Sequence, residues 1–323
     1  MRYLKWVLRI LIGYLTVTNY IVRKYTLLSS KINKEYNILG IADIHFNNFI
    51  NSKFLSSLKN LVINSKYDLI LISGDIMNSN MYLNNKSFNK VKSILDNISI
   101  LGKCPIYISL GNHDINTKHL EEVIKRFESL KYNTNLFPLD NETAYFNNLS
   151  ISGIRVPIEA YDRKNAFNEN GIILNNVLNS IKVNKKYYNI SLVHDPLSVY
   201  NSFKVNENNI NKFDLIFSGH LHGGYLSKSK ILDDSILEGN MEYFRDFKPF
   251  IKVPFVKGKH LFNNTHLIIN EGFRRYNGLI PSFIYTTPYF SSIKLLKKHW
   301  LISVFLFILF MFFIFSHLFR ANN

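Results

Sequence analysis

Five short motifs along this chain carry aspartate, histidine and asparagine side chains of the kind that bind divalent metal ions. They read D-I-H, G-D, G-N-H-D, V-H-D and G-H-L-H, and their candidate ligands are Asp43, His45, Asp75, Asn112, His194, His220 and His222. Carboxylate, imidazole and amide-oxygen ligands suit manganese, iron, zinc or nickel, unlike an all-thiolate structural site. No motif is specific alone, but the five together predict a centre of two divalent metal ions of unknown identity.

Such a centre suits chemistry at phosphorus. Two metal ions about 3.5–4 Å apart, bridged by a carboxylate, lower the pKa of bound water and clamp an in-line displacement. A phosphoryl group spreads its negative charge over several oxygens, so positioned cations are its main catalytic requirement. The motifs therefore predict a phosphorylated substrate.

Each motif follows a short apolar run, which places the candidate ligands at the ends of strands. The runs are rich in Ile, Leu and Val without alternation, as strands buried on both faces are. They are Ile38–Ala42, Leu69–Ser73, Ile106–Leu110, Ile190–Val193 and Leu215–Ser218. In α/β sheets, the loops that follow the carboxyl ends of the strands line a common crevice. We therefore expect the five loops that carry the motifs to meet there. Asp43 and His45 stand two apart, so an extended chain would point both the same way, and the same holds for His220 and His222.

Amphipathic stretches alternate with these runs and predict helices. They are Lys53–Ser65, Ser87–Asn97, Lys118–Leu130 and Ile172–Ile181. Residues 137–156 indicate instead a hairpin that turns at Asn147 and Asn148. We predict an α/β sandwich of β-sheets flanked by helices, forming one catalytic domain over residues 36–290.

The composition is basic. Thirty-nine Lys and Arg face 23 Asp and Glu, a formal net charge of +16. This charge indicates either attraction to phosphate, nucleic acid or anionic lipid, or a general abundance of lysine. No arginine-rich stripe is present, so we expect no sequence-specific nucleic-acid partner. The single cysteine, Cys104, excludes an intramolecular disulfide, and the oligomeric state is not predicted.

Both ends of the chain point to a membrane. Trp300–Phe319 is free of formal charge and about as long as the ~20 residues that span a bilayer, which predicts a transmembrane helix in a C-terminal segment 291–323. Leu4–Val22 is apolar but is interrupted by charge, so a span, an interfacial anchor and a cleaved signal stay open. We expect an uncleaved anchor and basic linker over residues 1–35.

Basic residues flank both apolar segments on the side of the central domain. They are Arg23, Lys24, Lys31, Lys34, Lys294, Lys297 and Lys298. Because Lys and Arg that flank membrane segments usually lie on the cytoplasmic side, we expect a protein of the cell membrane with a cytoplasmic catalytic domain.

From Asp43 to His222 the chain resembles, motif by motif and in order, the calcineurin-like metallophosphoesterases. The continuation G-H-L-H-G-G is similar to the bacterial, often membrane-associated branch that carries G-H-T-H-G-G-Q. Some members of that branch split UDP-diacylglucosamine. The resemblance implies hydrolysis of phosphoester or pyrophosphate bonds through a binuclear metal centre and a bridging hydroxide.

The resemblance also implies a role for each residue. The first metal would take Asp43, His45, Asp75 and His222. The second would take Asp75, Asn112, His194 and His220, with Asp75 as the bridge. His113 would lie outside the ligand shell and assist the leaving group.

Some positions depart from the family pattern or keep two interpretations. Asn78 stands where many relatives have an aspartate that orients the catalytic histidine, and an amide cannot stabilise imidazolium by charge. Tyr225 replaces the usual glutamine after G-H-x-H-G-G. Arg155 begins a stretch where relatives often have an acidic turn, so substrate contacts there are expected to differ. Asp114 is expected either to orient a neighbouring imidazole or to cap the next segment.

Two alternatives to a general metal-dependent phosphoesterase stay open. One is a lipid-linked pyrophosphatase of the UDP-diacylglucosamine type, which a membrane tether would favour. The other is a non-catalytic metal-binding module on the same scaffold.

Overall fold

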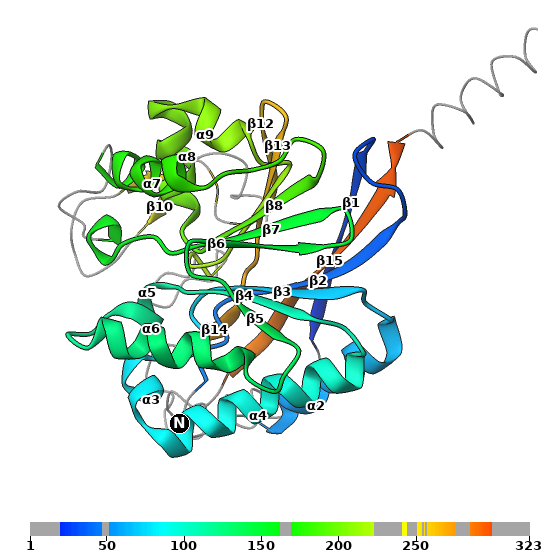
Figure 1. The fold of residues 1–323 in the computed structure, drawn as a ribbon, viewed down its shortest axis with the longest axis vertical. Coiled ribbons are helices and arrows are strands. Elements are labelled where there is room, and N and C mark those ends of the chain that lie inside the picture. The colour runs from blue at the N-terminus through cyan, green and yellow to red at the C-terminus, as the bar shows by residue number, and fades with distance from the viewer. Residues whose placement is uncertain are drawn as a thin grey trace, which may run out of the picture.

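The protein is an α/β sandwich of two mixed sheets that pack face to face, with helices on the outer faces (Figure 1). The computed structural model describes residues 20–46, 52–161, 169–222, 241–243, 251–253, 255, 257–275 and 285–298. The predicted fold class is confirmed for these residues.

The first sheet has seven strands. Its order is β1-β15-β2-β3-β4-β5, and β14 pairs with β15. The strands are β1 (Ile21–Ser29), β2 (Tyr36–Ile41), β3 (Leu69–Ser73), β4 (Ile106–Ser109), β5 (Leu136–Pro138), β14 (Phe273–Arg275) and β15 (Tyr285–Lys297). β2 to β5 are parallel, while β15 runs antiparallel to β2 and parallel to β1.

Helices cover the outer face of the first sheet. They are α2 (Ser52–Ser65), α3 (Ser79–Leu83), α4 (Asn85–Gly102), the short α5 (Asn112–Ile115), α6 (Leu120–Glu128) and the 3-10 turn η1 (Ser129–Lys131). Buried apolar residues of α2, α4 and α6 pack against this face. The helices predicted at Lys53–Ser65, Ser87–Asn97 and Lys118–Leu130 are confirmed, with small differences at their ends.

The second sheet has six strands in the order β12-β13-β9-β8-β7-β6. They are β6 (Glu142–Phe146), β7 (Leu149–Ile154), β8 (Tyr188–Val193), β9 (Leu215–Ser218), β12 (Gly258–Phe262) and β13 (Thr265–Ile269). Its helices are α7 (Glu169–Ser180), α8 (Pro196–Val205), α9 (Glu207–Asn211) and the 3-10 turn η2 (Ile158–Tyr161). A separate pair joins β10 (Met241–Tyr243) to β11 (Ile251–Val253). β6 and β7 form the predicted hairpin, and Asn147 turns it with a φ of 54°.

The strands are buried on both faces, as their apolar runs predict. On β2, Ile38 belongs to the apolar cluster between the sheets, and Leu39 belongs to the cluster under the helices. The sheets lie close together at Gly40, where an added Cβ would lie 2.4 Å from the Phe217 ring of β9. This contact brings the carboxyl ends of β2 and β9 together at the seam of the sandwich.

The two terminal regions differ from the prediction. Residues 21–29 and 291–297, expected in an anchor, a linker and a C-terminal segment, instead pair with each other as β1 and β15 in the first sheet. The apolar pattern of Ile21 and Val22 therefore belongs to a half-buried edge strand. The domain limits themselves stay a prediction.

The predicted membrane segments lie almost wholly outside the described residues. This is true of residues 1–19 and of the whole of Trp300–Phe319. Within the part of the chain that the structure describes, no helix has the length and apolar character that crossing a bilayer requires.

Candidate metal centre

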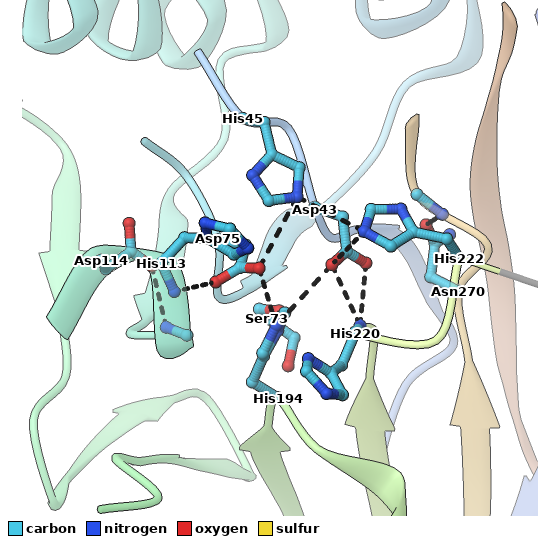
Figure 2. Close-up of polar contacts among 12 residues, drawn as sticks. Asp43, His45, Ser73, Asp75, His113, Asp114, His194, His220, His222 and Asn270 are labelled. Atoms are coloured by element: carbon cyan, nitrogen blue, oxygen red, sulfur yellow. Dashed lines mark hydrogen bonds and ion pairs between the residues drawn. The ribbon is translucent and has the colours of Figure 1, made fainter. Parts of the chain in front are cut away.

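The loops that follow five strands bring the predicted ligands together at one edge of the sandwich (Figure 2). β2, β3 and β4 of the first sheet lead to Asp43 and His45, to Asp75, and to Asn112 at the start of α5. β8 and β9 of the second sheet lead to His194 and to His220 and His222. The expected convergence at the carboxyl ends of the strands is therefore present, and both sheets contribute to it.

Six of the seven predicted ligands, together with His113, form three overlapping groups whose donor atoms lie within 4.8 Å of one another. The groups are Asp43, His45 and His222; His45, Asp75 and His113; and Asp75, His194 and His220. Asp75 belongs to two of them, as a bridging carboxylate requires. Its Oδ2 lies 3.2 Å from His194 Nε2 and 3.6 Å from His45 Nε2.

The backbone at these ligands is not the extended chain that the two-residue spacing predicted. Asp43 and His45 have φ of 53° and 48°, and His220 and His222 have 67° and 46°. Asp75 has a φ of 51°. Aspartate and histidine enter this left-handed region more readily than most residues, yet it costs on the order of 1–3 kcal/mol each. Sharp turns, rather than strand alternation, aim these paired ligands at one point.

Close backbone packing holds two of the loops against the carboxylates. A Cβ on Gly111 would lie 2.3 Å from Asp75 Oδ1, and one on Gly219 would lie 2.4 Å from Asp43 Oδ2. The His220 amide donates to both carboxylate oxygens of Asp43 at 3.0 Å. Only glycine fits at these two positions without displacing a carboxylate.

The arrangement of donors fits divalent cations. Asp43, Asp75 and His194 are almost fully buried. The Nε2 atoms of His45 and His222 face each other at 3.4 Å, and His222 Nε2 lies 3.6 Å from Asp43 Oδ1. The amide oxygen of Asn112 is buried without a hydrogen-bond partner among the described residues. Lone pairs that converge in this way, from nitrogen and oxygen ligands, suit borderline divalent metals.

Burial and neighbouring charge shift the pKa values of these groups in opposite directions. Burial raises the pKa of Asp43 above its usual value. Burial also opposes ionisation of Asp75, but the imidazoles of His194, His45 and His113 outweigh it and hold the pKa of Asp75 well below its usual range. Burial lowers the pKa of His194, but the charge of Asp75 raises it to about 10 overall. Burial lowers the pKa of His220 to about 4, which leaves that imidazole neutral and able to bind a metal.

Asp114 holds the loops of Asp75 and His113 in place. Its carboxylate accepts hydrogen bonds from the backbone amides of Gly111, Ile76 and Met77 at 2.8, 3.1 and 3.0 Å. The Tyr82 hydroxyl also donates to it, at 3.2 Å. These contacts correspond to the capping role, since the Gly111 amide precedes the first turn of α5. Burial and the charge of Asp75 raise the pKa of Asp114 to about 7.

His113 lies beside the centre. Its ring meets the ring of His45 edge-on, with centroids 4.8 Å apart, and its backbone amide donates to Asp75 Oδ1 at 2.8 Å. Asn78 stands just before α3, and its amide oxygen is buried without a hydrogen-bond partner among the described residues. The predicted contact between Asn78 and His113 stays a prediction, and Tyr225 lies outside the described residues.

The resemblance to the family implies that the stretch INEGFRRYNGLIP returns to the site, but sequence reasoning missed how the turn after β13 supports Asp43. A Cβ on Gly272 would lie 2.5 Å from Asp43 Cβ, so this turn packs directly on a predicted ligand. Arg23 of β1 pairs with Glu271 through two hydrogen bonds of 3.0 Å, and Lys257 lies 3.4 Å from the same carboxylate. Glu271, a charged residue two positions after the apolar run of β13, is the signal that was available.

Tyr161 was also missed. Its ring lies edge-on to His220, with centroids 5.1 Å apart. Burial, followed by the charges of Asp195 and of the aspartates in the centre, raises the pKa of Tyr161 well above its usual value. It ends η2, which carries no motif, and it begins the polar stretch Tyr161–Asn170.

Known proteins resemble this chain over the part that carries the motifs. The sequence model of the family described as calcineurin-like phosphoesterase matches residues 36–224, more than half of the chain. Phosphodiesterase YaeI of Escherichia coli (strain K12) is 36% identical over 80 residues, which are 24% of this chain and 27% of that protein. The match thus spans about a quarter of the length of that curated relative.

Solved structures resemble the chain more distantly. The protein TT1561 of Thermus thermophilus has a TM-score of 0.44 at 10% identity, over 74% of this chain and 90% of that one. GAP50, the anchor in the inner membrane complex of Plasmodium, has a TM-score of 0.42 at 12% identity, over 79% of each chain. A dimetal phosphatase from Danio rerio has a TM-score of 0.36 at 10% identity, over 73% of this chain and 87% of that one. All three scores lie below 0.5 and carry no functional argument.

Because Asp75 belongs to two groups of donors, its substitution should change the metal content of the protein. We expect the purified full chain to bind two divalent ions, and Asp75→Asn to lose at least one of them, because both groups of donors lose a charged oxygen. Elemental analysis after dialysis measures this, with Asp96→Asn on α4 as the control. Equal metal content in Asp75→Asn and the wild type would contradict the shared role.

Proposed function

Because the chain belongs to the calcineurin-like phosphoesterase family, we propose that it hydrolyses phosphoester or pyrophosphate bonds at a binuclear metal centre. One observation carries this proposal: buried and half-buried carboxylate and imidazole donors form three overlapping groups, two of which share Asp75. A non-catalytic module would have no need for His113 beside that centre. The family membership establishes the class of metallophosphoesterase hydrolases, while the reaction and the substrate are our proposal.

We propose the ligand assignment that the motifs implied. One ion would be held by Asp43, His45, Asp75 and His222, and the other by Asp75, Asn112, His194 and His220. When bound, the ions supply an activated water and neutralise charge on the phosphoryl oxygens. The donor set favours manganese, iron, zinc or nickel and does not choose among them.

Neighbouring groups hold the proposed ligands and His113 in position. The carbonyl oxygen of Ser73 lies 2.7 Å from His194 Nδ1, which directs Nε2 of that ring at Asp75. Asp114 fixes the backbone that follows Asp75, through the Ile76 amide, and the backbone that precedes His113, through the Gly111 amide. We propose that His113 donates a proton to the leaving-group oxygen, since its ring borders the centre without being among the proposed ligands.

Loss of His113 is expected to separate catalysis from metal binding. His113→Ala should lower kcat for an aryl phosphodiester by about 10²- to 10⁴-fold, the usual contribution of a general acid, and should keep the metal content. Addition of a chelator to the wild type should abolish hydrolysis. The assay uses the full chain in detergent, with His260→Ala of β12 as the control.

Equal residual hydrolysis in the wild type, His113→Ala and Asp75→Asn would refute the proposed activity. Metal binding with no turnover of any phosphoester would support the non-catalytic module instead.

We further propose that the enzyme is anchored in the membrane and belongs to the branch of the family that carries G-H-x-H-G-G. The uncharged sequence Trp300–Phe319 supports an anchor. The position of the first described residues supports a centre close to the bilayer. The Tyr20 ring packs edge-on to Phe290 at 5.8 Å, and the next residue, Ser291, pairs with Gly40. An anchor formed by residues 1–19 would thus begin at the carboxyl edge of the sheet, beside Asp43, whereas β15, which precedes Trp300–Phe319, ends at the opposite edge, where Lys297 pairs with Ser29.

This geometry favours a lipid-linked pyrophosphate as a second candidate substrate class. An enzyme whose catalytic edge lies at the bilayer meets substrate concentrated in two dimensions. We expect a higher kcat/KM for a lipid-linked diphosphate in vesicles than for soluble nucleoside diphosphates, measured on the full chain. Equal kcat/KM for both classes would argue against a lipid substrate and leave the general phosphoesterase proposal standing.

The basic flanks support a cytoplasmic catalytic domain at the cell membrane. In intact cells, external protease should therefore leave the central domain uncut, and permeabilised cells should lose it. Cleavage of the domain in intact cells would reverse the proposed orientation.

A further inference from the structure

The hydroxyl of Tyr161 is a buried donor that has no partner in the part of the chain that the structure describes. Tyr161 ends η2, and its hydroxyl makes no hydrogen bond within the described residues although it is shielded from solvent. Leaving such a group unpaired in the folded protein is unfavourable, because the hydroxyl loses its hydrogen bonds to water. A phenol at neutral pH is a hydrogen-bond donor, so its natural partner is an acceptor oxygen.

Its position is next to the centre. The Tyr161 ring lies edge-on to His220, with centroids 5.1 Å apart and planes at 63°. His220 belongs to the group of donors that includes Asp75 and His194. His113, by contrast, groups with His45 and Asp75. Tyr161 and His113 therefore border different parts of the centre.

The neighbouring carboxylates are already occupied. Asp195 accepts from the backbone amides of Leu197 and Ser198 at 3.0 and 3.1 Å, and from the Ser198 hydroxyl at 2.5 Å. Asp114 accepts from three backbone amides and from Tyr82. Neither of them uses Tyr161 as a donor.

The basic residue on the same segment does not serve as an alternative donor. Arg155 follows β7 directly and begins the stretch where the sequence predicts different substrate contacts. Its Nε lies 2.8 Å from Asp140, which holds the guanidinium in an ion pair. Tyr161 is thus the donor on this segment that is placed against a proposed ligand.

We propose that the Tyr161 hydroxyl donates a hydrogen bond to a non-bridging oxygen of the phosphoryl group bound at the Asp75–His194–His220 side of the centre. The inference rests on the proposed function and names one more residue that touches the substrate. A donor aimed at oxygens that gain charge in the transition state stabilises it, while His113 serves the leaving group.

Substitution of Tyr161 should weaken phosphate binding without changing metal content. The experiment uses the full chain in detergent, loaded with Mn²⁺, and compares the wild type with Tyr161→Phe. Calorimetry with inorganic phosphate should show about 10- to 100-fold weaker binding, the usual value of a hydrogen bond to a charged group, and kcat/KM for an aryl phosphodiester should fall by a similar factor.

Tyr188→Phe is the matched control. The Tyr188 hydroxyl is also buried without a hydrogen-bond partner among the described residues, but it begins β8 at the end far from His194. Loss of its hydroxyl should change neither phosphate affinity nor kcat/KM.

Two results would overturn the role of Tyr161. One is equal phosphate affinity in Tyr161→Phe and the wild type. The other is loss of metal in Tyr161→Phe, which would assign the hydroxyl to a metal ion. A metal-loaded wild type that binds phosphate but hydrolyses no ester would refute the proposed function alone, because the phosphate comparison would still decide the role of Tyr161.

Discussion

Two carboxylates, Asp43 and Asp75, are buried side by side at the seam between the sheets, and this constraint governs the rest of the structure. His194 Nε2 lies 3.7 Å from Asp43 Oδ1 and 3.2 Å from Asp75 Oδ2, so one imidazole serves both (Figure 2). Buried charges of the same sign are unfavourable unless cations and hydrogen-bond donors surround them. The histidines, the backbone amides and the proposed metal ions meet that need.

The scaffold holds these groups in conformations that an isolated chain would avoid. Left-handed backbone at Asp43, Asp75 and His220 persists only where the surroundings fix it. Asp114 fixes one side through the amides of the Asp75 loop. Gly272, held through Glu271 by Arg23, packs against the other side at Asp43. The edge strand β1 is therefore part of the support of the centre, although it is remote in sequence from every motif.

The sequence predicts the centre better than it predicts the scaffold around it. Runs such as Leu69–Ser73 are apolar without alternation, so both their strand character and the position of Asp75 can be inferred locally. The pairing of β1 with β15 cannot, because its register joins residues such as Ile21 and Tyr289 that lie at opposite ends of the chain. The half-exposed pattern of β1 also overlaps with that of an interfacial anchor. Tyr161 escapes because its role depends on the fold of η2 rather than on a motif.

The electrostatics link metal binding to proton release. In the metal-free protein, His194 holds its proton tightly, because the Asp75 carboxylate raises the pKa of that imidazole. The protonated imidazole in turn lowers the pKa of Asp75. A metal ion needs the neutral imidazole, so its binding must displace that proton, and acid must oppose binding. His220 starts neutral and presents no such barrier. The two histidines beside Asp75 therefore differ in protonation before a metal ion binds. His220 is already neutral, whereas His194 carries a proton whose positive charge the metal ion replaces.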